Sequence, residues 1–485
     1  MTLTAIGIFL ALGLLVRLAP RARGWLVFAI SVLAVFALQP AVPVRGLDFW
    51  LPVGTLAAAG LGWLLTSTAE ARAPRENWTA AAGLVGAALI AALNRFLPEP
   101  LLTPSRPPQL GQVLVGLAIL AALAGAAWWS VRSERQPEGA KRPTPPGRRG
   151  MAAAWALIGA LLALFVILKT PELHMWASGV LRGLVGQSTA LASPVDLRWL
   201  GFSYLAFRLI HTARDRQEGR LPAVTLREYV TYAVFAPALT AGPIDRLERF
   251  IKDLRQAWQP DAPGLAEAGK RLAIGLLRKF VVADLLALMA LDAAAAGQVR
   301  SAEWAWVLVY AYALQIYFDF SGYTDIAIGL GLLVGVRLPE NFNAPYSRLN
   351  LQMFWNNWHM TLTQWFRAYF FNPLTRWLRS GTRRLPAAWV ILITQVATFV
   401  LIGLWHGVTW NFVIWGLWHG LGIFAQNRYS DWAKRRIPAQ TGWRERALKA
   451  GSWLLTFHYV ALGWVWFALP TPELALRVLR VMFGG

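Results

Sequence analysis

The chain has 485 residues, of which 56% are hydrophobic and only 15% are charged. Soluble globular domains carry about 25% charged residues, so the composition excludes an ordinary soluble protein and favours a polytopic membrane protein, whose spans need about 20 apolar residues each. The net charge is +22 and cysteine is absent, which excludes disulfides, thiolate metal sites and a cysteine nucleophile.

The sequence predicts an N-terminal membrane module of five spans over residues 1–130. Its apolar stretches lie near residues 2–16, 24–44, 49–67, 78–97 and 109–130. The first stretch lacks a basic n-region and a small-residue cleavage pattern, so we expect it to be retained rather than removed as a signal peptide.

A basic linker is predicted over residues 131–150. It reads VRSERQPEGAKRPTPPGRRG and carries six Arg or Lys residues against two Glu. Its Pro and Gly content predicts flexibility, and the positive-inside rule places it in the cytoplasm and the N-terminus outside. Because basic residues concentrate in such cytoplasmic loops, the net charge needs no nucleic-acid partner, and none is predicted.

Residues 151–485 predict a second membrane-embedded region. The apolar segment 171–186 is short and carries charged residues, which is typical of an interfacial or re-entrant segment. Residues 230–256 predict a short span broken by Pro237 and by Gly242-Pro243, followed by a basic amphipathic helix. We expect about 11 to 13 spans in total, with the interrupted segments lining a cavity rather than facing lipid.

The stretch from residue 315 to 422 places ionisable groups in apolar surroundings, where each needs a partner or a function. Asp319 and Asp325 flank Ser321-Gly322. One interpretation is structural: the helix breaks at Gly322 and Ser321 caps the next helix, with Asp325 near its positive end. The alternative is that one carboxylate orients a catalytic group or a substrate.

Two polar runs follow in the same stretch. The first contains Asn341, Asn343, Pro345, Tyr346 and Arg348, and this helix-breaking composition between apolar spans indicates backbone that lines a cavity. The second contains Asn356, Asn357, Trp358 and His359, and then Thr363 and Arg367 at a spacing of four. That spacing places His359, Thr363 and Arg367 on roughly one helix face, which fits either a tunnel lining or an interfacial helix with Trp and Arg anchors.

His406 lies in the sequence LWHG at the end of a long apolar run. A neutral imidazole there can act as a general base, because its pKa lies near the operating pH; the alternative is a packing residue. For His419 packing is the favoured role, because Gly416 and Gly420 form a small-xxx-small spacing that lets helices approach closely.

Four motifs now carry a resemblance, in the order YFDFSGYTDIAIGLGLLVG, LPENFNAPY, FWNNWHMTLTQWFRAYFF and LWHGVTWNFVIWGLWHG. They resemble the membrane-bound O-acyltransferase (MBOAT) family, in the bacterial branch of alginate O-acetylation and teichoic acid D-alanyl transfer proteins. The resemblance is strongest over residues 310–425, within an expected acyltransferase core at 151–485. It implies an all-α polytopic membrane fold with re-entrant segments and a central tunnel.

The resemblance also assigns roles to residues. It implies that His406 is catalytic and that His359 is a second functional position. The substrate- or tunnel-lining candidates are Asp319, Asp325, Asn343, Tyr346, Asn356, Asn357, Trp358, Thr363, Arg367, Trp405 and Trp410. The chain departs from the family pattern at Asn357, Gln364 and Ala368. No metal and no bound cofactor are expected; an acyl thioester, acetyl-CoA or an acyl or aminoacyl carrier protein, is the expected co-substrate.

The functional hypothesis is an O-acyltransferase of the cytoplasmic membrane. It moves an acyl group, preferably acetyl, from a cytoplasmic thioester to an extracytoplasmic polysaccharide or glycan, with His406 as general base and an exported acyltransferase- or esterase-like partner protein. One alternative is D-alanyl transfer from a carrier protein to a polymer of the teichoic acid type. An alternative of another class is a polysaccharide exporter or channel, because transporters also use broken helices and ionisable groups at mid-membrane.

Overall fold

A computed structural model describes residues 2–131, 147–380, 385–436, 438 and 440–485. Within these residues the chain is helical and forms no strand, which confirms the all-α prediction. The chain divides into two compact units, residues 1–272 with 326–339, and residues 273–325 with 340–485. The predicted linker at 131–150 falls mostly on residues 132–146, which lie outside the described residues.

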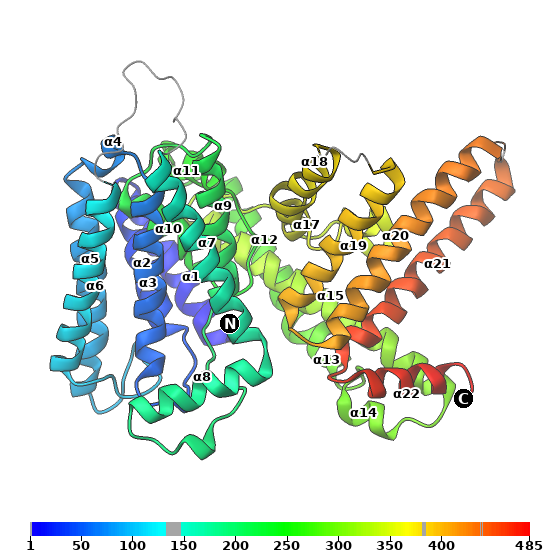
Figure 1. Ribbon diagram of the computed structural model, residues 1–485, viewed down its shortest axis with the longest axis horizontal. Helices are drawn as coiled ribbons and strands as arrows, with labels where there is room; N and C mark the ends of the chain where they lie inside the picture. Colours follow the sequence, from blue (N-terminus) through cyan, green and yellow to red (C-terminus); the bar gives the residue numbers. More distant parts are fainter. Residues whose placement is uncertain (1, 132–146, 381–384, 437, 439) are drawn as a thin grey trace. The chain divides into compact units, whose positions relative to one another are not determined.

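The first unit contains the N-terminal helices of Figure 1. Their bounds are α1 Leu3–Leu18, α2 Arg23–Ala37, α3 Leu47–Thr66, α4 Ala69–Arg72, α5 Glu76–Leu93, α6 Leu110–Val131, α7 Arg148–Lys169, α8 Pro171–Leu184, α9 Phe202–Gln217, α10 Leu226–Ala233, α11 Leu247–Arg255 and, in large part, α12 Ala262–Leu277. Helices α5 and α6 pack side by side (Figure 1), and α3 contacts α6, α7 and α9. Helices from both sides of the 131–150 segment therefore pack together in this unit.

Each of the five N-terminal apolar stretches forms a helix, as predicted. In the part of the chain that the structure describes, six helices are long and apolar enough to cross a membrane: Pro20–Ala37, Leu47–Thr66, Glu76–Phe96, Leu110–Val131, Gly150–Lys169 and Ala387–His406. Helix α1 is apolar but shorter. The total of about 11 to 13 spans stays a prediction, because the other helices are shorter or more polar.

The interrupted segment is broken where its prolines and glycine predicted. Helix α10 ends at Ala233, a single 3₁₀ turn covers Ala236–Ala238, and α11 begins at Leu247. Such a break frees backbone carbonyls that need donors. Buried Arg208 of α9 supplies them, donating to the carbonyl oxygens of Ala233 and Ala238 at 2.8 Å each. The guanidinium thus stabilises the broken backbone.

Helix α8, predicted as an interfacial or re-entrant segment, holds its buried charge in an ion pair. Arg182 Nε lies 2.8 Å from a carboxylate oxygen of Asp196, and the Ser178 hydroxyl donates to the same oxygen at 2.6 Å. His174 of this helix donates from Nδ1 to the Leu168 carbonyl and accepts the Leu197 amide at Nε2, so both ring nitrogens have a structural partner.

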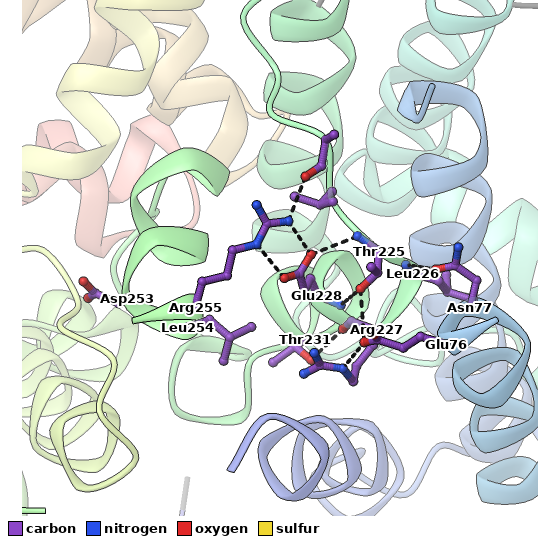
Figure 2. A network of polar contacts seen from close by, with 12 residues as sticks. Glu76, Asn77, Thr225, Leu226, Arg227, Glu228, Thr231, Asp253, Leu254 and Arg255 are labelled. Carbon is purple, nitrogen blue, oxygen red and sulfur yellow. Dashed lines mark hydrogen bonds and ion pairs between the residues drawn. The ribbon is translucent and has the colours of Figure 1, made fainter. Parts of the chain in front are cut away.

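A polar network joins α5, α10 and α11 (Figure 2). Glu228 closes a capping box with Thr225 at the start of α10, and its two carboxylate oxygens accept hydrogen bonds of 2.7 Å from Arg255. Arg227 pairs with Glu76 alongside. Burial alone raises the pKa of the Glu228 carboxyl. The net pKa is nevertheless below its ordinary value, because the carboxylate accepts hydrogen bonds from Arg255 and the Thr225 amide and lies near the charges of Arg255 and Arg227.

We expect Glu228→Gln to lower the free energy of unfolding by about 2 kcal/mol, because it removes the charge from a hydrogen-bonded pair. A lowered folded-state pKa stabilises the fold above the ordinary glutamate range, and this contribution disappears as the pH falls through the folded-state value. Thermal unfolding in detergent over a series of falling pH values from pH 7 checks this, since the difference between the two proteins should shrink as the pH falls. Glu76→Gln is the control, because its side chain is 31% exposed and such a pair contributes less than about 1 kcal/mol.

The second unit contains the C-terminal helices. Their bounds are α13 Asp284–Ala287, α14 Ala293–Gln298, most of α15 Ala302–Leu333, α16 Leu351–Trp355, α17 Met360–Phe366, α18 Asn372–Ser380, α19 Ala387–His406, α20 Trp410–Arg436, α21 Gly442–Ala468 and α22 Pro472–Met482, with π-helical turns at Arg278–Ala283 and Arg367–Phe371. Helices α20 and α21 lie side by side (Figure 1).

The break predicted at Gly322 is wrong, because α15 runs without interruption from Ala302 to Leu333. A Cβ atom at Gly322 would lie 2.8 Å from both the Gly275 carbonyl oxygen and the Lys279 amide nitrogen. This glycine therefore allows two backbones to approach, rather than a helix to end.

The close approach of α19 and α20 explains the small residues Gly416 and Gly420 of α20, as predicted. A Cβ at Gly416 would lie 2.6 Å from the Phe399 carbonyl oxygen and 2.6 Å from the Val400 Cα, both in α19. We expect Gly416→Ala to destabilise the protein by about 1–3 kcal/mol, because the clash is with backbone that cannot move aside. Thermal unfolding in detergent checks this. Gly451→Ala in α21 is the matched control, since nothing lies within 4 Å of its Cβ position; equal losses in both variants would contradict the explanation.

Candidate active site

The two carboxylates of α15 are held by the π-helical turn Arg278–Ala283. Arg278 lies 2.6 Å from Asp325, and Lys279 pairs with Asp319. The Asp325 side chain is 7% exposed and that of Asp319 is 45% exposed. Each charge therefore has a structural partner, while the proposed capping role is wrong because no helix begins at Ser321.

His359 occupies a strained and buried position at the N-cap of α17. Its φ of 41° is left-handed, and Ala344 is the one other non-glycine residue with positive φ among the described residues. A left-handed conformation costs a non-glycine residue about 1–2 kcal/mol and persists where the surrounding structure enforces it, often at functional sites. Its side chain is 3% exposed, and its ring lies edge-on to Phe320 at 4.7 Å between centroids.

Asn341, in the segment between α15 and α16, fixes the His359 ring. Its carboxamide oxygen lies 3.3 Å from His359 Nδ1 and accepts the Thr361 hydroxyl at 2.6 Å and the Thr361 amide at 3.4 Å. Its backbone carbonyl accepts the amide of Met360 at 2.9 Å. Asn341 is completely buried, whereas His359 Nε2 is buried without a hydrogen-bond partner.

His406 is the last residue of α19 and is half-buried in an aromatic cage. Its ring lies 4.6 Å from Phe467 and 5.8 Å from Phe412, measured between centroids. Trp405 connects it to the other histidine: the Trp405 ring is 4.4 Å from His406 and 6.3 Å from His359. The structure therefore brings the two predicted catalytic histidines to the same indole from different elements, the N-cap of α17 and the end of α19.

The other predicted lining residues divide into two groups. Trp358 is buried and packs against Trp464 at 5.0 Å, and the Tyr346 hydroxyl donates to the Ala313 carbonyl at 2.7 Å and accepts Trp464 Nε1. Thr363 and Asn357 are half-buried and donate to backbone carbonyls of Trp355 and Met353. The exposed candidates are Asn343, Asn356, Arg367 and Trp410.

Among these exposed candidates, Arg367 donates to Asn356 at 2.8 Å, and Trp410 is 72% exposed. A lining role for these four residues stays a prediction. Sequence reasoning missed two residues near the histidines, Trp415 and Phe467, and it named Asn341 only as part of a cavity-lining run. The helix-breaking run around Asn343 was the one available signal for Asn341.

His419 packs, in agreement with its predicted role. It is fully buried, accepts Trp355 Nε1 at its Nδ1 at 3.4 Å, and its Nε2 would lie 2.5 Å from a Cβ at Gly463 of α21. His458 donates from Nδ1 to the Leu454 carbonyl, so its Nε2 accepts the Tyr310 hydroxyl at 2.8 Å.

An all-α chain with several helices able to cross a membrane is a multi-pass membrane protein. Within that class, the sequence profile of the membrane-bound O-acyltransferase family matches residues 163–463. The chain belongs to the MBOAT family. Membership places it in the acyltransferase class, as predicted, rather than among exporters or channels.

Three curated relatives illustrate the likeness. A teichoic acid D-alanyltransferase of Bacillus subtilis (strain 168) is 31% identical over 56% of this chain and 69% of the relative. A peptidoglycan O-acetyltransferase of Helicobacter pylori is 35% identical over 53% of this chain and 46% of the relative. The protein named Probable alginate O-acetylase AlgI from Pseudomonas aeruginosa is 33% identical over 59% of this chain and 51% of the relative. The matches to the last two span only about half of those proteins.

Proposed function

We propose that the chain moves an acyl group, preferably acetyl, from a cytoplasmic thioester to an extracytoplasmic polysaccharide or glycan. The donor is a co-substrate, acetyl-CoA or an acyl or aminoacyl carrier protein. The observation that carries this proposal is that the rings of His359 and His406 both lie next to one indole, that of Trp405, inside the segment that matches the family. The names of the relatives, which act on teichoic acid, peptidoglycan and alginate, support an envelope polymer as acceptor.

In the proposed reaction His406 removes the proton from the attacking hydroxyl as its oxygen bonds to the thioester carbonyl carbon. The carbon–sulfur bond then breaks, and the imidazolium returns the proton to the departing thiolate. The products are an ester and a free thiol, so atoms and charge balance. His359 assists by holding a substrate group beside this centre. With no cysteine in the chain, transfer is direct or passes through an oxygen nucleophile.

The proposed setting is the cytoplasmic membrane, with the N-terminus outside. The charge pattern of the loops supports this orientation, because it leaves the basic segment 131–150 on the cytoplasmic side. An exported acyltransferase- or esterase-like partner completes the transfer to the polymer, as the family resemblance implies.

The test is acyl release from radiolabelled acetyl-CoA by the purified full-length protein, with the exported partner or an acceptor glycan added. We expect thiol release and label transfer that both depend on the acceptor. Absence of turnover by the wild-type protein with acceptor present would reject acetyl-CoA as the donor.

D-alanyl transfer is the second candidate, because a teichoic acid D-alanyltransferase is among the relatives, 31% identical over 69% of its length. The same assay with a D-alanyl-loaded carrier protein in place of acetyl-CoA decides between them. Consumption of the carrier-bound D-alanyl group alone would establish the second candidate.

A further inference from the structure

Three histidines of the second unit, His359, His419 and His458, have neighbours that determine which ring nitrogen holds the proton. At His419, Nδ1 faces the indole N–H of Trp355, which can only donate, so the proton lies on Nε2. At His458, Nδ1 faces the Leu454 carbonyl, which can only accept, so the proton lies on Nδ1 and Nε2 accepts from Tyr310. The neighbours of a neutral imidazole therefore determine its tautomer.

At His359 the neighbour is the carboxamide of Asn341, whose orientation is itself determined. The atom nearest the Thr361 backbone amide must be an acceptor, because a backbone N–H only donates. The alternative orientation would place the Asn341 NH₂ group against that donor. The Asn341 oxygen therefore faces His359 Nδ1 at 3.3 Å, so Nδ1 carries the proton and Nε2 holds a lone pair.

We propose that Asn341 is a positioning residue that holds His359 in the Nδ1–H tautomer, and that His359 Nε2 accepts a hydrogen bond from a second hydroxyl of the acyl acceptor, next to the hydroxyl that His406 deprotonates. This inference rests on the proposed function and specifies the substrate group at one position. A lone pair binds a proton-bearing group, and it repels the carbonyl oxygen of a thioester. His359 is thereby assigned to the acceptor hydroxyl rather than to the acyl donor.

Three observations support an assignment to substrate. His359 Nε2 is buried and has no hydrogen-bond partner, and a buried polar atom without a partner needs an explanation such as a reserved ligand position. The ring borders Trp405, which borders His406 in turn. The left-handed backbone of His359 is enforced from both sides, since the Met360 amide donates to the Asn341 carbonyl and the Thr363 amide donates to the His359 carbonyl.

The tautomer is tested directly by nitrogen NMR of the full-length protein labelled with ¹⁵N-histidine in detergent. The His359 signals are identified by their loss in His359→Asn, because asparagine tolerates the left-handed backbone. We expect a pyrrole-type Nδ1 and a pyridine-type Nε2 in the wild-type protein. A pyrrole-type Nε2, or averaged signals from two tautomers, would overturn the proposal whether or not any thioester is turned over.

The positioning role is tested with Asn341→Leu, which keeps the approximate shape and removes the acceptor. We expect the His359 signals to change to the Nε2–H form or to a mixture, and kcat to fall about tenfold, as loss of one hydrogen bond at the transition state implies. KM for the thioester should change less than about twofold, since His359 does not bind the donor.

Asn350→Leu is the matched control, because Asn350 caps α16 by accepting the Met353 amide at 2.8 Å. It should lower stability without moving the His359 signals. Unchanged signals in Asn341→Leu would overturn the positioning role, and so would changed signals with unchanged kcat. A raised KM for the thioester at constant kcat would overturn the assignment of His359 to the acceptor hydroxyl.

Discussion

Replacing His406 by alanine is expected to lower kcat for acyl transfer by about 10²–10⁴-fold, the range that a general base contributes. The side chain lies at the end of α19 against Phe467 and Phe412, and alanine removes the proton acceptor while leaving the helix intact. The measurement is thiol release from the donor that the wild-type protein uses, with thermal unfolding measured on both proteins to show that they fold equally well.

The control for this prediction is His458→Gln. His458 lies in α21, where both of its ring nitrogens are engaged by Leu454 and Tyr310, so we expect turnover within about twofold of the wild-type value. Turnover that is equal in His406→Ala and the wild-type protein would remove His406 from the mechanism. A comparable loss in His458→Gln would indicate that damage to the second unit, rather than loss of the base, lowers the rate.

The helices of the first unit could be predicted because the signal is local. Each apolar stretch is long enough to bury its own backbone hydrogen bonds in a helix, so α6 at Leu110–Val131 follows the apolar residues 109–130 almost to the residue. The break in residues 230–256 was likewise predictable, since a proline in a helix interior removes a backbone donor and clashes with the preceding turn.

Gly322 shows where local reasoning fails. A glycine followed by polar residues is typical of a helix end, but here its missing side chain makes room for the backbone of Gly275 and Lys279. Which of the two roles a glycine has depends on a segment far away in the sequence, and no spacing of neighbouring residues encodes that contact.

The candidate site was predictable to the same limited extent. His359 and His406 stand in recognisable motifs, yet their meeting at Trp405 depends on how the start of α17 packs against the end of α19. Asn341 and Asn343 look equivalent in the sequence. The structure separates them, because Asn341 is completely buried and hydrogen-bonded to Thr361, whereas Asn343 is exposed.

The two ion pairs of α15 give the second large expected effect. We expect Asp325→Asn to lower the free energy of unfolding by about 3 kcal/mol, because removing one partner of a buried pair leaves the other charge without compensation. The value lies at the low end of the range for such pairs because the Arg278 side chain is 35% exposed. Thermal unfolding in detergent measures it.

Asp319→Asn is the matched control, since this pair joins the same two elements but the Asp319 side chain is 45% exposed. An exposed pair contributes at most about 1 kcal/mol, so this variant should unfold close to the wild-type temperature.

The double variant Asp325→Asn with Arg278→Gln should recover much of the lost stability, because no charge then remains uncompensated. A different result is that Asp325→Asn and Asp319→Asn both lose little stability while only Asp325→Asn loses turnover. Asp325 would then act on the substrate instead of holding the π-helical turn. Equal stability losses in the single and double variants would show that Asp325 stabilises the fold through partners other than Arg278.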